Sequence, residues 1–395
     1  MGFNRDRLQA IDGFLKSAYL DTGKLPCALL QVSQGGELVH SSAQGFADMA
    51  QQRSIADDTI FRIYSMTKPI ASVALMMLVE EGRLQLDDPV HRHIPEWKHL
   101  KVYAGGTLKT GWLTKACARP MQVIDLLRHT SGLTYGFQLN SNVDAAYRRL
   151  GIGEIEKGEM TLERMVAALA DLPLEFSPGE WWNYSVATDV VGWLVQVISG
   201  EPFEEFLRRR IFVPCGMVDT GFHVRAGQEA RLATCYQPSK HGLLVQDQAD
   251  SSGFLRPPSF ISGGGGLVST AADYLRFCEA LRTGHPRLVG RKTLELMTAN
   301  HLPGDKTLPQ LSKSAFSEAA YDGVGFGLGF ATTTAVHKTL IAGNTGDYFW
   351  GGAASTFFFI DPEAEMVVTF MTQLMPSSTW PVRRQLRTMI YAAMD

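Results

Sequence analysis

Strand-like runs lie at both ends of this 395-residue chain, and an amphipathic helix accompanies each set. The N-terminal helix is predicted from apolar residues at helical spacing, Leu8, Ile11, Phe14, Leu15 and Tyr19. The runs CALLQVS and ELVHSSA follow it, and Gln34-Gly35-Gly36 between them is typical of a hairpin turn. Near the C-terminus, GVGFGLGFATT, HKTLIAG, AASTFFFI and MVVTFMTQ precede the helical run VRRQLRTMIYAAM. This order predicts one antiparallel sheet built from both termini, with the terminal helices covering one face.

The middle of the chain has a different pattern. Helical periodicity recurs over residues 66–81, 122–129, 160–172 and 186–199, with Pro- and Gly-bearing loops between them. We therefore predict an α/β fold with two parts: residues 1–85 and 265–395 form an α/β domain, and residues 86–264 form a mostly helical domain inserted between them. An active site is expected in the cleft between the two parts.

Charge and composition exclude several classes of protein. Lys and Arg total 37, Asp and Glu total 40, and no basic stripe stands out, so we expect no nucleic-acid partner. The sequence has no apolar signal-peptide core and no membrane-length apolar run, which predicts a cytoplasmic protein without a membrane partner. The five scattered cysteines include no C-x-x-C, as expected of reduced thiols. Metal and dinucleotide motifs are missing too, so we expect neither a metal nor an organic cofactor.

The motif Ser65-Met66-Thr67-Lys68 is the only S-x-x-K in the chain. It opens the apolar run PIASVALMMLVEEG, in which Pro69 suits a first helical turn and Gly82 suits a C-terminal stop. Ser65 is therefore predicted at the N-terminal end of a buried helix. Residues three apart on a helix share a face, so the Lys68 amine should lie beside the Ser65 hydroxyl.

This pairing favours nucleophilic catalysis. A serine hydroxyl is a weak nucleophile until a base removes its proton. A lysine can be that base if burial or a neighbouring positive charge lowers its pKa, and the N-terminal end of an apolar helix supplies both influences to Lys68. The same helix end offers backbone N–H groups to a developing oxyanion. The alternative is that Ser65 only caps the helix and that Lys68 lies on the surface.

A second candidate is Tyr184, in the stretch PGEWWNYSV just before the helical run VATDVVGWLVQVISG. Ser185 suits the N-cap of that helix. A phenol at this position can be held partly ionised by the helix dipole and a nearby lysine, and can then carry a proton. The alternative is a structural tyrosine at a helix entrance.

A third candidate is Trp350-Gly351-Gly352-Ala353, which directly precedes the strand-like run AASTFFFI. Its glycines permit close approach of a substrate to a strand edge, where a backbone N–H can donate to an oxyanion. An ordinary turn is the alternative. The glycine run from Gly263 to Gly266 has no following lysine, so it is not a P-loop, but it could line the same site.

These signals occur in an order that resembles the serine β-lactamase and penicillin-binding protein superfamily, and more narrowly the family VIII carboxylesterases. The supporting stretches include FRIYSMTKPIASVALMMLVEEGRLQLDDPV, LLRHTSGLTYG, GGGGLVSTAADYLRF and WGGAASTFFFIDPE. The resemblance implies that Ser65 is the nucleophile and Lys68 its base. It also implies that Tyr184 protonates the leaving oxygen and later activates water, with oxyanion donors at the N–H groups of Ser65 and Ala353.

Two departures from the β-lactamase pattern favour esters as substrates. Val186 stands where that pattern has the asparagine of Tyr-x-Asn, and Trp-Gly-Gly stands where it has Lys-Thr-Gly. Losing the amide and the cation that grip a β-lactam should favour uncharged small-molecule esters, with weak β-lactamase activity still open. The remaining alternatives are an acyltransferase of the same group, a D-amino-acid peptidase and a non-catalytic binding protein. Aromatic residues that could shape an acyl pocket, or equally belong to the core, are Tyr135, Phe137, Trp181, Trp182, Tyr348 and Phe349.

Overall fold

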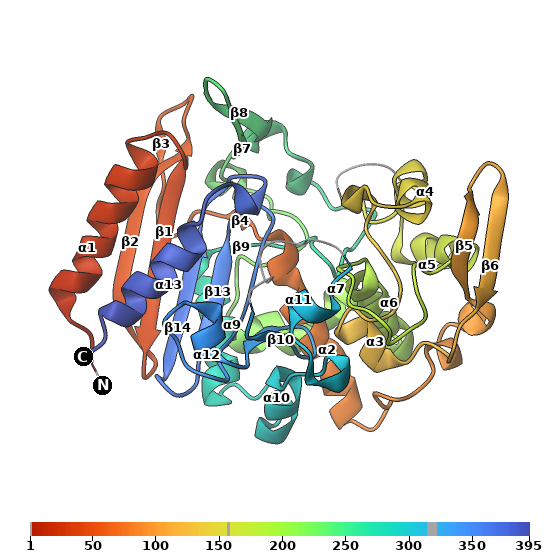
Figure 1. Ribbon diagram of the computed structural model, residues 1–395. Coiled ribbons are helices and arrows are strands. Elements are labelled where there is room, and N and C mark those ends of the chain that lie inside the picture. Colours follow the sequence, from red (N-terminus) through yellow and green to blue (C-terminus); the bar gives the residue numbers. More distant parts are fainter. Residues whose placement is uncertain (1, 156–158, 314–321) are drawn as a thin grey trace.

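One antiparallel sheet joins the two ends of the chain (Figure 1). The computed structural model describes residues 2–155, 159–313 and 322–395, and within them this sheet has eight strands. In spatial order they are β10 (Val324–Phe326), β11 (Ala331–Thr333), β12 (Tyr348–Gly351), β13 (Phe357–Asp361), β14 (Met366–Met371), β1 (Cys27–Gln34), β2 (Glu37–Asp48) and β3 (Arg53–Ser54). The C-terminal β14 pairs with the N-terminal β1, with Leu29 opposite Met371. The predicted sheet built from both termini is confirmed.

The central strands are apolar on both faces because both faces are covered. Along β13, Phe357 and Phe359 enter one hydrophobic cluster, whereas Phe358 and Ile360 enter another. Side chains alternate between the faces of a strand, so a continuous apolar run means burial on both sides. This explains why FFFI contains no polar residue.

The two terminal helices cover one face of the sheet, as predicted. Helices α1 (Arg5–Leu15) and α13 (Val382–Ala392) lie side by side in Figure 1, where the chain termini also meet. Ile11 and Leu386 pack in the same buried cluster as Phe359. On the opposite face, α9 (Ala271–Thr283) packs against β14.

The region beside the sheet is mainly helical. Its helices are α2 (Thr67–Glu80), α3 (Val123–Leu127), α4 (Asn142–Leu150), α5 (Leu162–Ala170), α6 (Ala187–Ser199), α7 (Phe203–Leu207) and α8 (Val213–Cys215). Helix α2 is buried along nearly its whole length and packs against α6, as expected of a helix that is apolar all round. Short strand pairs complete the region: β4 (Phe61–Arg62) with β9 (Val268–Ser269), β5 (Lys101–Thr107) with β6 (Gly111–Ala116), and β7 (Cys235–Ser239) with β8 (Gly242–Asp247).

Two strand predictions near the C-terminus were wrong in detail. The run HKTLIAG contains the helical turn α12 (Val336–Thr339), after which Leu340 adopts a left-handed φ of 57°. The run GVGFGLGFATT is a hairpin of β10 and β11 instead of one strand. Short apolar runs do not distinguish a strand from a helical turn by periodicity. Helices α10 (Arg291–Thr298) and α11 (Leu308–Leu311) precede this part of the chain.

One buried cluster runs from the sheet into the helical region, since it contains Leu29 and Phe358 as well as Leu126 and Val191. The division at residues 85 and 265 therefore stays a proposal. Among the described residues, no helix is long and apolar enough to cross a membrane.

Candidate active site

Ser65 lies in the 3-10 turn Tyr64–Met66, which leads directly into α2. Tyr64 has a φ of 41°, a left-handed conformation that is uncommon outside glycine, so the chain bends sharply just before Ser65. The N-cap of α2 is Met66 and makes no side-chain capping bond. Ser65 therefore does not cap the helix. Its side chain lines a cavity of about 800 Å³ together with Tyr184, Gly352 and Ala353.

The Lys68 amine lies beside the Ser65 hydroxyl, as the helical spacing predicts. Its Nζ is 3.3 Å from Ser65 Oγ, 3.1 Å from the Tyr135 hydroxyl and 2.6 Å from the carbonyl oxygen of Gly264. Burial lowers the pKa of Lys68 to about 7, although the negative charge of Asp189 opposes this shift. Near neutral pH a substantial fraction of Lys68 is therefore an uncharged amine.

The surroundings of Lys68 orient that neutral amine. It has two N–H donors and one lone pair, and the Gly264 carbonyl can only accept a hydrogen bond. When Tyr135 accepts the second N–H, the lone pair remains for the Ser65 proton. This is the arrangement that a general base requires.

Tyr184 approaches Ser65 from the end of the loop that precedes α6. Its hydroxyl donates a 2.6 Å hydrogen bond to Ser65 Oγ, and its ring centroid lies 4.4 Å from Lys68 Nζ. Burial raises the pKa of Tyr184 well above its usual value, against the opposing hydrogen bonds with Ser65 and Trp350. The hydroxyl thus keeps its proton near neutral pH, contrary to the partial ionisation expected. It is placed to donate a proton, as an acid does.

Two buried titratable residues near the site were missed as functional residues in the sequence. Asp189 on α6 accepts hydrogen bonds from the Ser262 hydroxyl at 2.5 Å and the Gly264 N–H at 2.9 Å, and its charge acts on Lys68. The signal was available, because Asp189 is the only charged residue of an apolar helix. His129, interpreted as part of a helix end, lies with its ring centroid 5.0 Å from that of Tyr184. Burial and the Lys68 charge hold the pKa of His129 well below its usual value, so its ring is neutral.

Two backbone N–H groups in the cavity wall suit an oxyanion. The N–H groups of Ser65 and Ala353 have no acceptor among the residues that the structure describes. Both residues line the same cavity. Trp350 and Gly351 end β12, and Gly352 begins the turn to β13, so the motif lies at the end of a strand and the next strand starts only at Phe357. Pairs of open amide donors are the usual oxyanion ligands in acyl transfer.

The predicted aromatic pocket residues fall into separate places. Tyr135 and Phe137 line the active-site cavity and stack with ring centroids 4.7 Å apart. Phe349 and Trp350 line a second cavity of about 280 Å³, which shares Gly351, Ser377 and Ser378 with the first. The remaining three lie outside the residues that line either cavity: Tyr348 and Trp182, which are buried in the core, and Trp181, which is 40% exposed.

In a comparison with known protein families, residues 11–390 match the family described as Beta-lactamase. The chain belongs to the beta-lactamase family. The resemblance predicted from the motifs is thereby confirmed, together with the α/β fold of this family. The protein is accordingly a serine hydrolase or acyltransferase of the beta-lactamase family.

Several known proteins are similar to this chain over almost its whole length. Protein Rv1367c of Mycobacterium tuberculosis is 36% identical over 362 residues, covering 90% of this chain and 88% of the relative. Esterase EstB of Burkholderia gladioli is 31% identical and covers 93% of this chain and 91% of its own. Among solved structures, EstCE1, a hydrolase with promiscuous acyltransferase activity, has a TM-score of 0.81 at 26% identity and covers 98% of each chain.

Proposed function

We propose that the protein is a serine carboxylesterase that hydrolyses short-chain carboxylic esters through an acyl-enzyme on Ser65. The observation that carries this proposal is the double contact of Ser65 Oγ, 3.3 Å from Lys68 Nζ and 2.6 Å from the Tyr184 hydroxyl, in an open cavity. One contact supplies a base and the other an acid, which are the two groups that ester cleavage needs.

In the acylation step, neutral Lys68 accepts the Ser65 proton as Oγ attacks the ester carbonyl carbon. The negative charge forms on the carbonyl oxygen, between the N–H groups of Ser65 and Ala353. The bond to the alcohol oxygen then breaks, and that oxygen takes the proton of Tyr184. Lys68 returns a proton to Tyr184, so both residues are neutral again beside the acyl-serine.

In the deacylation step, water attacks the acyl carbon and its proton passes to Lys68, instead of to Tyr184 as the resemblance implies, because the buried phenol keeps its own proton. The bond to Ser65 Oγ breaks, Oγ regains a proton through Tyr184, and the carboxylic acid leaves. The cavity volume of about 800 Å³ lies within the usual range for small-molecule sites. No step uses a metal or an organic cofactor.

The side chains at the two departures support esters over β-lactams. Val186 is a fully buried hydrocarbon side chain, so this position offers no side-chain amide to a β-lactam. Trp350 turns its indole towards Tyr184, with ring centroids 5.6 Å apart, where the β-lactamase pattern has a lysine. The name of EstB also supports an esterase.

The proposal is tested by p-nitrophenyl butyrate hydrolysis with wild type, Ser65→Ala and the matched control Ser72→Ala. Ser72 is a buried serine of α2, the helix that follows Ser65, and its Oγ makes no hydrogen bond in the described part of the chain. We expect Ser65→Ala to lose at least about a thousandfold in kcat, as for removal of a nucleophile, and Ser72→Ala to stay near wild type. Equal activity of wild type and Ser65→Ala would exclude the acyl-Ser65 mechanism.

Acyl transfer is a second candidate, favoured by the 98% coverage of EstCE1, whose description includes promiscuous acyltransferase activity. In that reaction an alcohol instead of water attacks the acyl-Ser65. Adding a primary alcohol to the assay distinguishes the two: transfer gives a new ester in proportion to the alcohol, whereas hydrolysis gives only the free acid.

A further inference from the structure

We propose that Arg383, on the C-terminal helix α13, is a positioning residue for the second oxyanion donor. Its guanidinium holds the turn from Gly352 to Thr356 so that the N–H of Ala353 points into the active-site cavity. This inference rests on the proposed function, because it assigns a role within the same acyl-transfer site. Arg383 lies 31 residues after Gly352 and belongs to none of the sequence motifs.

The contacts of Arg383 are aimed at this turn. Its Nη2 donates to the carbonyl oxygen of Gly352 at 2.7 Å and to that of Thr356 at 2.6 Å. A hydrogen bond within the turn also closes it, since the Gly352 N–H donates to the carbonyl oxygen of Thr356 at 2.8 Å. Ser355 within it has a left-handed φ of 68°, a conformation that serine seldom adopts and that surrounding bonds must maintain.

One peptide unit connects Arg383 to the oxyanion site. The carbonyl of Gly352 and the N–H of Ala353 belong to the same peptide bond, which is planar and trans. In a trans peptide the two groups point in opposite directions, so fixing the carbonyl on Arg383 also fixes the direction of the N–H. A hydrogen bond from a cation to the carbonyl further polarises the amide and strengthens its N–H as a donor.

The glycines of the motif are explained by the same arrangement. A Cβ at Gly351 would lie 2.7 Å from the guanidinium carbon of Arg383, and a Cβ at Gly352 would lie 2.3 Å from the carbonyl oxygen of Ile63. The motif is therefore held between the arginine on one side and the backbone two residues before Ser65 on the other. Each glycine gives one of these neighbours the space that it needs.

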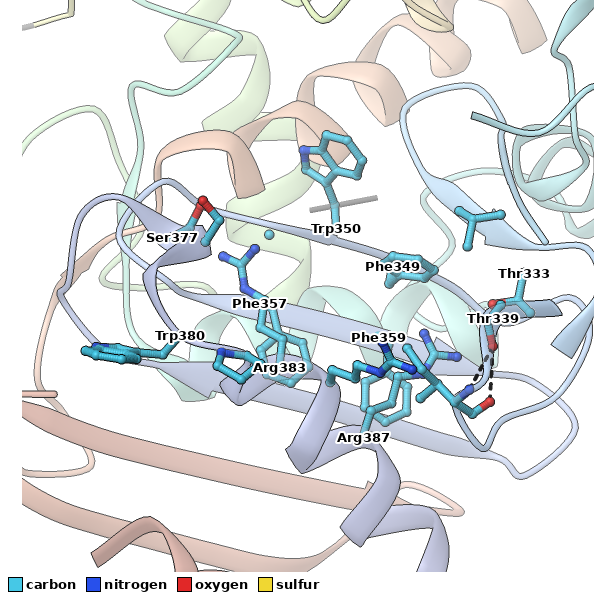
Figure 2. Close-up of a pocket in the computed structure, with 16 residues that line it drawn as sticks. Thr333, Thr339, Phe349, Trp350, Phe357, Phe359, Ser377, Trp380, Arg383 and Arg387 are labelled. Carbon is cyan, nitrogen blue, oxygen red and sulfur yellow. Dashed lines mark hydrogen bonds between the residues drawn. The ribbon is translucent and has the colours of Figure 1, made fainter. Parts of the chain in front are cut away.

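Figure 2 shows the guanidinium of Arg383 pointing along the wall of the second cavity towards Ser377 and the strand that carries Trp350. Burial lowers the pKa of Arg383 to about 9, so the group remains a cation near neutral pH. Its charge also opposes the rise in the pKa of Tyr184 that burial causes. During the reaction, negative charge develops on the carbonyl oxygen of the ester and on the phenol of Tyr184. The positive charge of Arg383 therefore favours both charged groups.

The test compares Arg383→Met and Arg383→Lys with the control Arg384→Met, the neighbouring arginine whose Nη2 is bonded to Leu340 instead of the turn. We expect Arg383→Met to lose about a hundredfold in kcat for p-nitrophenyl butyrate, near the effect of removing one oxyanion donor, with KM within about twofold of wild type. Arg383→Lys should retain more activity than Arg383→Met. Guanidinium ion at a non-denaturing concentration should restore at least part of the loss in Arg383→Met and leave wild type unchanged.

The outcomes separate this inference from the proposed function. If wild type forms no phosphonate adduct on Ser65, the proposed function fails before Arg383 is considered. If wild type forms the adduct but Arg383→Met keeps kcat within about threefold, the positioning role is wrong. If neither the Arg383→Lys substitution nor added guanidinium ion restores activity, Arg383 has only a structural role. Melting curves of the variants then show whether the fold was lost.

Discussion

The hydroxyl of Tyr184 donates a 2.6 Å hydrogen bond to the Oγ of Ser65, across 119 residues of chain. A protonated donor in this place cannot also accept the Ser65 proton, so the base must be a different group. Lys68 also contacts Ser65 Oγ, and burial lowers the pKa of its amine to about 7. Tyr184, which keeps its proton, is thus the acid, and Lys68, which can be neutral near pH 7, is the base.

Tyr184→Phe should reveal this division through the leaving group. The variant keeps the buried ring and its contact with His129 but loses the proton donor. We expect a loss of about a hundredfold or more in kcat/KM for ethyl butyrate, which reports acylation, because its alkoxide leaves poorly without a proton. The loss in kcat/KM for p-nitrophenyl butyrate should be much smaller, since p-nitrophenolate leaves without one. Equal losses for both esters would contradict the role of Tyr184 as the acid.

The pH dependence of kcat/KM should report Lys68. Only the neutral amine can accept the Ser65 proton, so activity should rise with pH through a midpoint near the Lys68 pKa of about 7. Asp189→Asn keeps an acceptor oxygen for Ser262 and Gly264 but removes the charge that raises the pKa of Lys68. The midpoint should therefore move to lower pH. A midpoint that stays in place or rises would show that Asp189 does not act on the base.

Gly352→Ala tests the crowding around the oxyanion turn. The added Cβ would lie 2.3 Å from the carbonyl oxygen of Ile63, so the turn or the segment before Ser65 must move. We expect a loss of about 1–3 kcal/mol in the free energy of unfolding and a clear fall in kcat. Gly253→Ala is the matched control, because a Cβ there meets no described atom within 4 Å. Thermal unfolding that is unchanged in both variants would argue against the tight packing of Gly352.

Nitrocefin hydrolysis tests the preference for esters. Val186 and Trp350 replace the amide and the cation that hold a β-lactam in the related pattern, so each lost contact should weaken binding in the transition state. We expect kcat/KM for nitrocefin at least about a hundredfold below that for p-nitrophenyl butyrate, which corresponds to losing a few kcal/mol. Comparable values for both substrates would make the β-lactamase alternative the better account.

The parts of the site that are local in sequence could be predicted. Ser65 and Lys68 lie one helical turn apart, and α2 places them as the spacing indicates. Tyr184 lies just before α6, as predicted. The N-cap of that helix is Val186 instead of Ser185, whose hydroxyl accepts a hydrogen bond from the Ala187 N–H. Local periodicity and helix termini carry this information, because they depend on neighbouring residues only.

The contacts that tune the site are long-range and could not be predicted this way. Gly264, whose carbonyl accepts from Lys68, lies 196 residues later in the chain, and Arg383 lies beyond every motif. The predicted strand AASTFFFI also begins later than expected. Its first four residues, AAST, form the turn before β13, and the strand begins at Phe357. Such pairings follow from sheet register and packing, which one sequence does not display.

The most direct test of the account is the mass of the wild-type protein after reaction with a p-nitrophenyl phosphonate, followed by peptide mapping. We expect one phosphonyl group per chain, on the peptide that contains Ser65, and no adduct in Ser65→Ala. An adduct on any other residue, or an active esterase that forms none, would contradict the assignment of Ser65 as the nucleophile.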